Sequence, residues 1–335
     1  MSKVASTILS IFGLLTIGAI IDWSKSDAFT SVVLTLLAIF VALMIHELGH
    51  VCGAMVSRSK VLTFAVGPIK IKRMENDQYK WGWVDSWSEV GGYVQIEHHQ
   101  KKIENAILIS VFGGPLASLV LASVYFSPIY FLEIVGVTSF FLFLVTMLPY
   151  NATGFFSDGY TMLQILKNNN VFINYYKMTN HLLAKDSPKK WGKELQEEVG
   201  TIDAKRLTPT ELSIYFMFLF YSAVETRELS HLRQFYHTID LHQISSQASH
   251  QGQLAAIYHY YVATQYLLGE PMTITESQLQ DLPAFDALSV ARTKAILTQN
   301  VEAYERYAKH LTHVDQTSYS FLQAEKKFNE RYVNV

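Results

Sequence analysis

The segment His46-Glu47-Leu48-Gly49-His50 holds the residues of this sequence that are best suited to chemistry. On a helix, residues four apart lie on one face, so the imidazoles of His46 and His50 can reach one metal ion. Glu47 then stands beside the metal as a general base toward bound water. With 12 histidines in 335 residues, chance produces this spacing only about 0.02 times. The segment therefore predicts a zinc site that activates water.

A catalytic zinc ion usually takes a third protein ligand and keeps its fourth position for water. Asp158, in Ser157-Asp158-Gly159, follows a long apolar stretch and is expected at the same depth as His46 and His50. Gly159 would allow a tight backbone turn beside the metal. The alternative is that Asp158 caps the N-terminus of the next helix, and the two roles are compatible because a carboxylate has two oxygens.

These candidate ligands stand in or next to apolar stretches that are long enough to cross a bilayer of about 30 Å. The first stretch is expected to be an uncleaved span, because Ile20-Ile21-Asp22-Trp23 offers no small-x-small cleavage site. The zinc motif lies near the end of the second stretch, where buried polar groups are costly unless they have a function. The four stretches are Val4–Ile21, Ser31–Val56, Ile103–Tyr125 and Ile129–Tyr150.

The composition divides the chain into a membrane half and a soluble half. Hydrophobic residues make up 50% and charged residues 17%, against about 25% charged in soluble domains. Residues 1–165 carry 21 charged side chains and residues 166–335 carry 35. The net charge of −2 argues against nucleic-acid binding, which needs a basic face. The single cysteine, Cys52, excludes an intramolecular disulfide and a cysteine-rich zinc site.

The segment between the second and third stretches sets the expected orientation. It carries eight basic residues, whereas residues 22–29 carry only Lys25, so the positive-inside rule places this segment, both termini and the active site in the cytoplasm. Its β-branched and aromatic runs, separated by Gly and Pro, predict a small sheet at the cytoplasmic membrane surface. The expected strands are 61–66, 69–72, 81–84 and 93–96.

The chain from about residue 160 onward is expected to be helical. Apolar residues recur at helical spacing in 208–226, 252–268, 284–298 and 301–313. The apolar run at 212–223 is too short for a span and predicts a buried core helix. Residues 257–261 resemble a tetratricopeptide helix, although no period of about 34 residues follows, so an irregular bundle is the alternative.

The ordered motifs resemble the site-2 protease family of intramembrane zinc metalloproteases, peptidase family M50. The first is the zinc motif at 46–50, and the last is the Asp-Gly pair at 158–159. Between them, Gly91-Gly92-Tyr93-Val94 is similar to the glycine-rich segment of the family's membrane-associated β-region. Residues 113–117, Gly-Gly-Pro-Leu-Ala, are similar to the Gly-Pro segment of its next span. The resemblance covers residues 31–166.

The resemblance implies a mainly α fold. We expect a polytopic α-helical membrane domain of about four spans at 1–166, with a small membrane-associated β-region at about 57–100. A linker with helices at 167–207 and a soluble all-α cytoplasmic domain at 208–335 would follow. The turn at 126–128 leaves no room for a PDZ domain. We expect an integral protein of a bacterial cell membrane.

The resemblance also implies the site and its chemistry. Glu47 is the expected catalytic base, and the metal set of His46, His50 and Asp158 would hold one Zn²⁺ per chain. The expected substrate is a transmembrane or membrane-anchored protein or peptide, cut during regulated intramembrane proteolysis or peptide and signal-remnant processing. The other expected partners are the lipid bilayer and a protein partner of the C-terminal domain. Gly91, Gly92, Tyr93 and Asn151 are the candidates for binding substrate or the oxyanion.

The sequence departs from the family pattern at two places. Members often carry Asn-x-x-Pro before the Asp-Gly pair, whereas here Pro149 precedes Asn151. Ser118 stands where members commonly have Asn after the Gly-Pro segment.

Two other functions remain open. A membrane-tethered zinc peptidase that degrades soluble or misfolded chains would take its third ligand from a downstream Glu, here Glu194, Glu197 or Glu198. A non-catalytic zinc-binding scaffold is the other, although it has no need for Glu47. His98 and His99 are a rival metal pair, but adjacent side chains diverge, so we expect surface residues.

Overall fold

The computed structural model describes residues 27–74, 77–84, 89–99, 102–152, 155–183, 191, 193–241, 251–280, 286–314 and 320–333. The apolar stretch Val4–Ile21 lies outside these residues, so its role as a span stays a prediction. The described chain forms two compact units. The first unit comprises the described residues up to Asn151 and Phe156–Asn168, and the second comprises Ala152, Phe155 and the residues from Asn169 onward.

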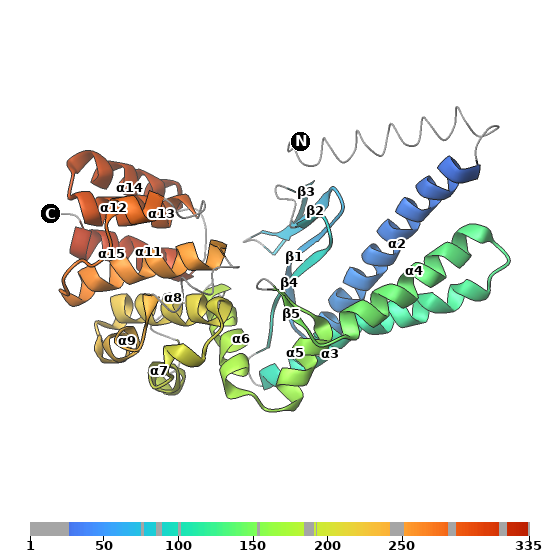
Figure 1. Cartoon of the computed structure of the whole chain (residues 1–335), viewed down its shortest axis with the longest axis horizontal. Coiled ribbons are helices and arrows are strands. Elements are labelled where there is room, and N and C mark those ends of the chain that lie inside the picture. The colour runs from blue at the N-terminus through green and yellow to red at the C-terminus, as the bar shows by residue number, and fades with distance from the viewer. Residues whose placement is uncertain are drawn as a thin grey trace. The chain divides into compact units, whose positions relative to one another are not determined.

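Three long apolar helices form the framework of the first unit (Figure 1). They are α2 (Asp27–Val56), α3 (Ile103–Ala122), which continues as the 3₁₀ turn η3 (Ser123–Phe126), and α4 (Tyr130–Met147). By length and composition, Thr30–Val56, Ile103–Phe126 and Tyr130–Met147 can each cross a membrane. This confirms the expected membrane helices among the described residues.

Small residues allow α2 and α3 to approach closely. A Cβ built on Gly49 would fall 2.8 Å from the carbonyl carbon of Gly113 and 2.6 Å from Cβ of Ala117. One turn further along α2, a Cβ on Gly53 would fall 2.5 Å from the carbonyl oxygen of Ile109. Small residues four apart are the usual means by which membrane helices bring their backbones into contact. The tight packing fixes the zinc motif against α3.

The β-region is a four-stranded antiparallel sheet with the order β3-β2-β1-β4. Each strand overlaps the run of β-branched and aromatic residues that predicted it, so the expected mainly α fold with a small sheet is confirmed. β3 and β4 are the edges of the sheet. The strands are β1 (Lys60–Val66), β2 (Ile69–Arg73), β3 (Tyr79–Trp83) and β4 (Tyr93–Glu97).

The sheet reaches deeper along α2 than the sequence suggested. Gly67, in the β1–β2 turn, has φ +54°, and a Cβ there would fall 2.5 Å from the ring of Phe40. Phe40 lies 16 residues before the helix end at Val56, or about 24 Å at 1.5 Å per residue. The turn therefore lies beside the middle of a membrane helix, not only at its surface end as expected. Gly67 and Pro68 are buried within the first unit.

A short connection follows the last membrane helix. The two-residue strands β5 (Asn151–Ala152) and β6 (Phe155–Phe156) pair with each other, and α5 (Asp158–Leu166) begins directly after them. α5 packs against α3 and α4 in the first unit. α5 therefore lies against α3, the helix that faces the zinc motif.

The second unit is a helical bundle around an aromatic core. α8 is buried along most of its length, which confirms the core helix expected at 212–223. It begins with a capping box in which Thr208 and Glu211 each bond the other's backbone N–H. The helices are α6 (Asn170–Leu183), α7 (Lys193–Gly200), α8 (Pro209–Thr226), α9 (Ser230–Tyr236), α11 (Gln251–Leu268), α12 (Glu276–Gln280), α13 (Ala287–Thr298), α14 (Val301–Val314) and α15 (Ser320–Phe328), with short turns η5 (Ala204–Arg206) and η6 (Asn329–Val333).

A buried ion pair crosses the core of this bundle. Arg292 Nη1 lies 2.7 Å from Glu325 Oε2, and both side chains are fully buried. The Tyr307 hydroxyl donates to Glu325 Oε1 at 2.6 Å, and the guanidinium lies 4.7 Å from the ring centre of Tyr260. Removing either charged partner would leave an uncompensated charge in the core. The pair therefore fixes the packing of α11, α13 and α15.

Candidate metal centre

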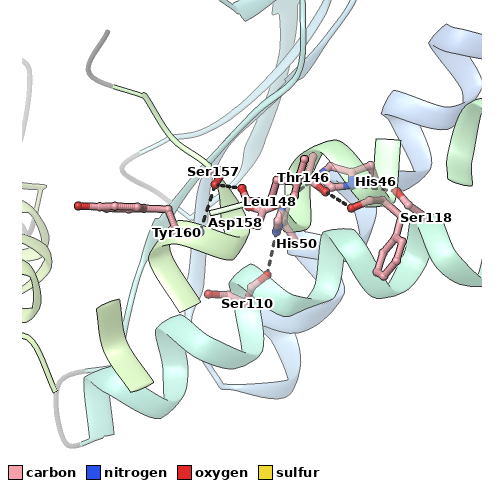
Figure 2. Close-up of polar contacts among 10 residues, drawn as sticks. His46, His50, Ser110, Ser118, Thr146, Leu148, Ser157, Asp158 and Tyr160 are labelled. Atoms are coloured by element: carbon pink, nitrogen blue, oxygen red, sulfur yellow. Dashed lines mark hydrogen bonds and ion pairs between the residues drawn. The ribbon is translucent and has the colours of Figure 1, made fainter. Parts of the chain in front are cut away.

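Two histidines of α2 and one aspartate of α5 converge on a single point (Figure 2). His46 Nε2 lies 3.3 Å from Asp158 Oδ2, and His50 Nε2 lies 3.6 Å from Asp158 Oδ1. The two Nε2 atoms are 3.2 Å apart. The helical i, i+4 spacing places both imidazoles on one face, and α5 supplies the carboxylate opposite them. The structure thus brings together three residues that the sequence selected.

The other ring nitrogens of both histidines contact α3. His50 Nδ1 donates to the carbonyl oxygen of Ser110 at 2.9 Å, since a carbonyl oxygen only accepts. His46 Nδ1 lies 2.9 Å from the hydroxyl of Ser118. With the Nδ1 proton of His50 committed to Ser110, its Nε2 presents a lone pair to the shared point. Partners of this kind orient metal-binding histidines in known metal sites.

The residue that caps α5 is Ser157, so the alternative of Asp158 as the cap is wrong. The Ser157 hydroxyl donates to the carbonyl oxygen of Leu148 at 2.6 Å and accepts from the backbone N–H group of Tyr160 at 3.1 Å (Figure 2). It also accepts from the backbone N–H group of Tyr150 at 3.1 Å. Asp158 is instead the first residue of the helix. Ser157 thus ties the end of α4 to the start of α5, which leaves the Asp158 carboxylate to face the histidines.

Gly159 allows α5 to lie close to the end of α4 and does not form the expected turn. It lies within α5, and a Cβ there would fall 2.5 Å from the carbonyl carbon of Met147, at the end of α4. A larger residue would push α5 and its carboxylate away from the histidines.

Glu47 lies beside the three convergent residues and is 9% exposed. Its carboxylate lies near His50 and Asp158. On its other side, a Cβ built on Gly92 would fall 2.9 Å from both Cγ and Cδ of Glu47. Gly92 also has φ +106°, a conformation that only glycine adopts readily. The glycine-rich turn before β4 therefore forms one wall of the space around Glu47.

The donor set suits a divalent transition metal. Two imidazole nitrogens and a carboxylate oxygen lie within 4.8 Å of one another, and no other such group of three occurs among the described residues. Two His and one carboxylate are a common zinc set, with the fourth position left for water. By their chemistry and their convergence, His46, His50 and Asp158 are thus a candidate metal-binding site.

The other predicted site residues lie near the sheet edge or on the connection after α4. Gly91 is exposed, with open space where a side chain would start, and Tyr93 begins the edge strand β4 with 41% of its surface exposed. Asn151 is exposed on β5. Only Gly92 is shown in contact with Glu47, so the roles of the other three stay predictions.

The rival candidate ligands lie outside α2 and α5. Glu194, Glu197 and Glu198 belong to α7 of the second unit, and the last two are exposed. His98 is 8% exposed, which corrects the expectation of a surface residue, and burial lowers its pKa to about 4. His99 is exposed, as expected.

Comparison with known families decides the identity. The sequence model described as peptidase family M50 matches residues 34–318, which includes the zinc motif, Asp158 and most of the second unit. The chain belongs to this family. It is therefore a metallopeptidase and, with its apolar helices, a membrane protein. The M50 match extends well past residue 166, where the motif resemblance ends. Searches of curated proteins and of solved structures each return no match.

Sequence reasoning missed the three serines that position the ligands of this M50 chain. Ser110 and Ser118 stand eight residues apart on one face of α3, and both are fully buried. Polar residues buried at that spacing in an apolar span were a signal for them. For Ser157, the signal was a good capping residue directly before a helix.

Replacing Ser118 by alanine should weaken zinc binding by about 10- to 100-fold, because His46 loses the partner of its Nδ1 atom. Competition against a chelator of known zinc affinity measures this change in purified protein. Ser139→Ala is the matched control: Ser139 is buried in α4, and its hydroxyl has no hydrogen-bond partner among the described residues. Equal zinc affinity in the two variants would contradict the orienting role of Ser118.

Proposed function

We propose that this M50 chain is an intramembrane zinc endopeptidase that cuts membrane-anchored proteins in or near their transmembrane segments. The observation that carries the proposal is the depth of the convergent residues. His46 stands 10 residues before the end of the span at Val56, or about 15 Å along the helix. A site for hydrolysis at that depth suits a peptide bond that lies within the membrane.

His46, His50 and Asp158 would hold the zinc ion, which when bound acts as a Lewis acid and lowers the pKa of water toward 7. Glu47 accepts the proton of the attacking water and later donates a proton to the leaving amine. Asn151 is proposed to hydrogen-bond the carbonyl oxygen of the substrate as negative charge develops on it.

The substrate must unwind before it is cut, because a helical peptide bond is shielded by its own hydrogen bonds. β4 is an edge strand of the sheet, and Gly91 and Gly92 precede it at the wall of the Glu47 space. An extended substrate segment adding to this edge would satisfy its backbone N–H and C=O groups through the sheet. Tyr93 would then contact a substrate side chain.

The orientation is part of the proposal. The eight basic residues between α2 and α3 favour a cytoplasmic location for this segment and for the active site. The second unit would then stand in the cytoplasm as well, where we propose that it binds a protein partner.

The test is a cleavage assay in liposomes. Wild-type protein is reconstituted with a tagged single-span reporter whose apolar segment carries Gly and Asn near its cytoplasmic end, and an unfolded soluble protein is added outside. We expect a cut within the apolar segment that stops on zinc chelation and resumes on zinc addition, with the soluble chain left intact. Zinc-dependent cleavage of the soluble chain alone would instead favour the tethered peptidase.

A further inference from the structure

Two glycines seat the sheet on one face of α2. Gly67 lies against Phe40, and Gly92 lies against Glu47. Phe40 and Glu47 are seven residues apart, about two helical turns, and so lie on the same face. The β1–β2 turn and the turn before β4 therefore both rest on the helix face that carries the expected base.

An ion pair joins this sheet to the turn that touches Glu47. Lys70 Nζ of β2 lies 2.6 Å from Glu89 Oε1, and each side chain is 19% exposed. In the sheet, Lys70 is paired with Ala65 on one side and with Gly82 on the other. These small neighbours on the same face leave room for the lysine to extend toward Glu89.

Backbone hydrogen bonds also stabilise the turn from Glu89 to Gly92. Gly67 N–H donates to the Val90 carbonyl oxygen at 2.9 Å, and Gly92 N–H donates to the Glu89 carbonyl oxygen at 3.4 Å. Among the described residues, a backbone hydrogen bond and an ion pair thus attach the turn from Glu89 to Gly92 to the β1–β2 hairpin. Of these two, only the ion pair depends on side chains.

We propose that Lys70 and Glu89 are positioning residues, whose ion pair holds the Gly91-Gly92 turn against Glu47 and so sets the position of the base. The catalytic part of this inference rests on the proposed peptidase function. The structural part, that the ion pair holds the turn in place, does not depend on that function. A charge-assisted pair shielded from water is stronger than an exposed one. Its loss also removes a charge-assisted contact between two largely buried side chains, which favours movement of the turn.

Cysteine labelling tests the position of the turn without any proteolysis. Cys52 is the single cysteine, so Cys52→Ala with Glu47→Cys places one thiol under Gly92. With the ion pair intact, a water-soluble maleimide should label it slowly. Adding Lys70→Met or Glu89→Gln should raise the labelling rate about tenfold, by local opening of the turn. The charge-swapped pair Lys70→Glu with Glu89→Lys should restore slow labelling.

Lys60→Met is the matched control. It breaks the exposed pair of Lys60 and Glu97 in the same sheet, where the side chains are 58% and 22% exposed. Labelling of Lys70→Met and Glu89→Gln at the rate of Lys60→Met would overturn the inference.

Kinetics with native Glu47 separates positioning from stability. Per zinc-loaded chain, Lys70→Met should lower kcat about tenfold, and the charge swap should restore it, because the base moves while the metal set stays. A loss of folded protein with unchanged kcat per zinc would overturn the positioning role. If wild type cleaves nothing, the proposed function fails, while the labelling result still decides whether the ion pair holds the turn.

Discussion

Glu47→Gln should reduce peptide hydrolysis by roughly 10²- to 10⁴-fold, the usual contribution of a general acid–base group. Glutamine keeps the shape of the side chain between Gly92 and the histidines, but it does not accept a proton from water. The convergent set of His46, His50 and Asp158 does not include Glu47, so the zinc content should stay at about one per chain. Metal analysis and cleavage of the liposome reporter, both on the same preparation, check the two parts.

Glu133→Gln is the control for loss of a glutamate from an apolar span. Glu133 lies in the first turn of α4 and is exposed, so its neutralisation should leave cleavage unchanged. Loss of zinc from the Glu47 variant would make Glu47 a ligand. Cleavage at more than about a tenth of the wild-type rate would mean that another group takes the proton.

Asp158→Ala should remove most of the bound zinc. Asp158 is the one carboxylate in the convergent set, and two imidazoles alone form an incomplete zinc site. The loss of affinity should exceed the roughly 10- to 100-fold expected when only a partner of a ligand is removed. Metal analysis of detergent-purified protein, with Asp158→Asn as a variant of similar size, gives the result.

The matched variants for this experiment are Glu197→Ala and Glu198→Ala. Both residues are exposed on α7 and are two of the three candidates for the third ligand of the rival peptidase. We expect these variants to keep wild-type zinc. Full zinc in Asp158→Ala, with loss in one of the α7 variants, would reverse the assignment.

Local patterns predicted the parts of the molecule that depend on near neighbours in the sequence. The i, i+4 histidines, the apolar lengths and the β-branched runs around Gly67 each define their own element. The depth of the sheet followed from none of these. It depends on the contact of Gly67 with Phe40, which is set by packing between distant segments.

The site also combines residues that the sequence predicted with contacts between distant segments that it did not predict. Asp158 was found because its position after a span matched the depth of His46 and His50. The sequence left a cap at Asp158 open as an alternative, since Ser and Asp are both good caps and only the three hydrogen bonds of Ser157 distinguish them. The contact of Gly92 with Glu47 joins residues 45 positions apart, and no periodicity encodes it.

The three candidate ligands are synthesised at different times during translation. His46 and His50 are translated 112 and 108 residues before Asp158, and the intervening chain must supply α3 and α4 before α5 can pack. At about 5 to 20 residues per second, a nascent chain spends several seconds or more with the base in place and the third ligand missing. On the proposed chemistry, a chain that the ribosome releases before Asp158 is made lacks the third ligand. Such a chain would not cleave neighbouring membrane proteins.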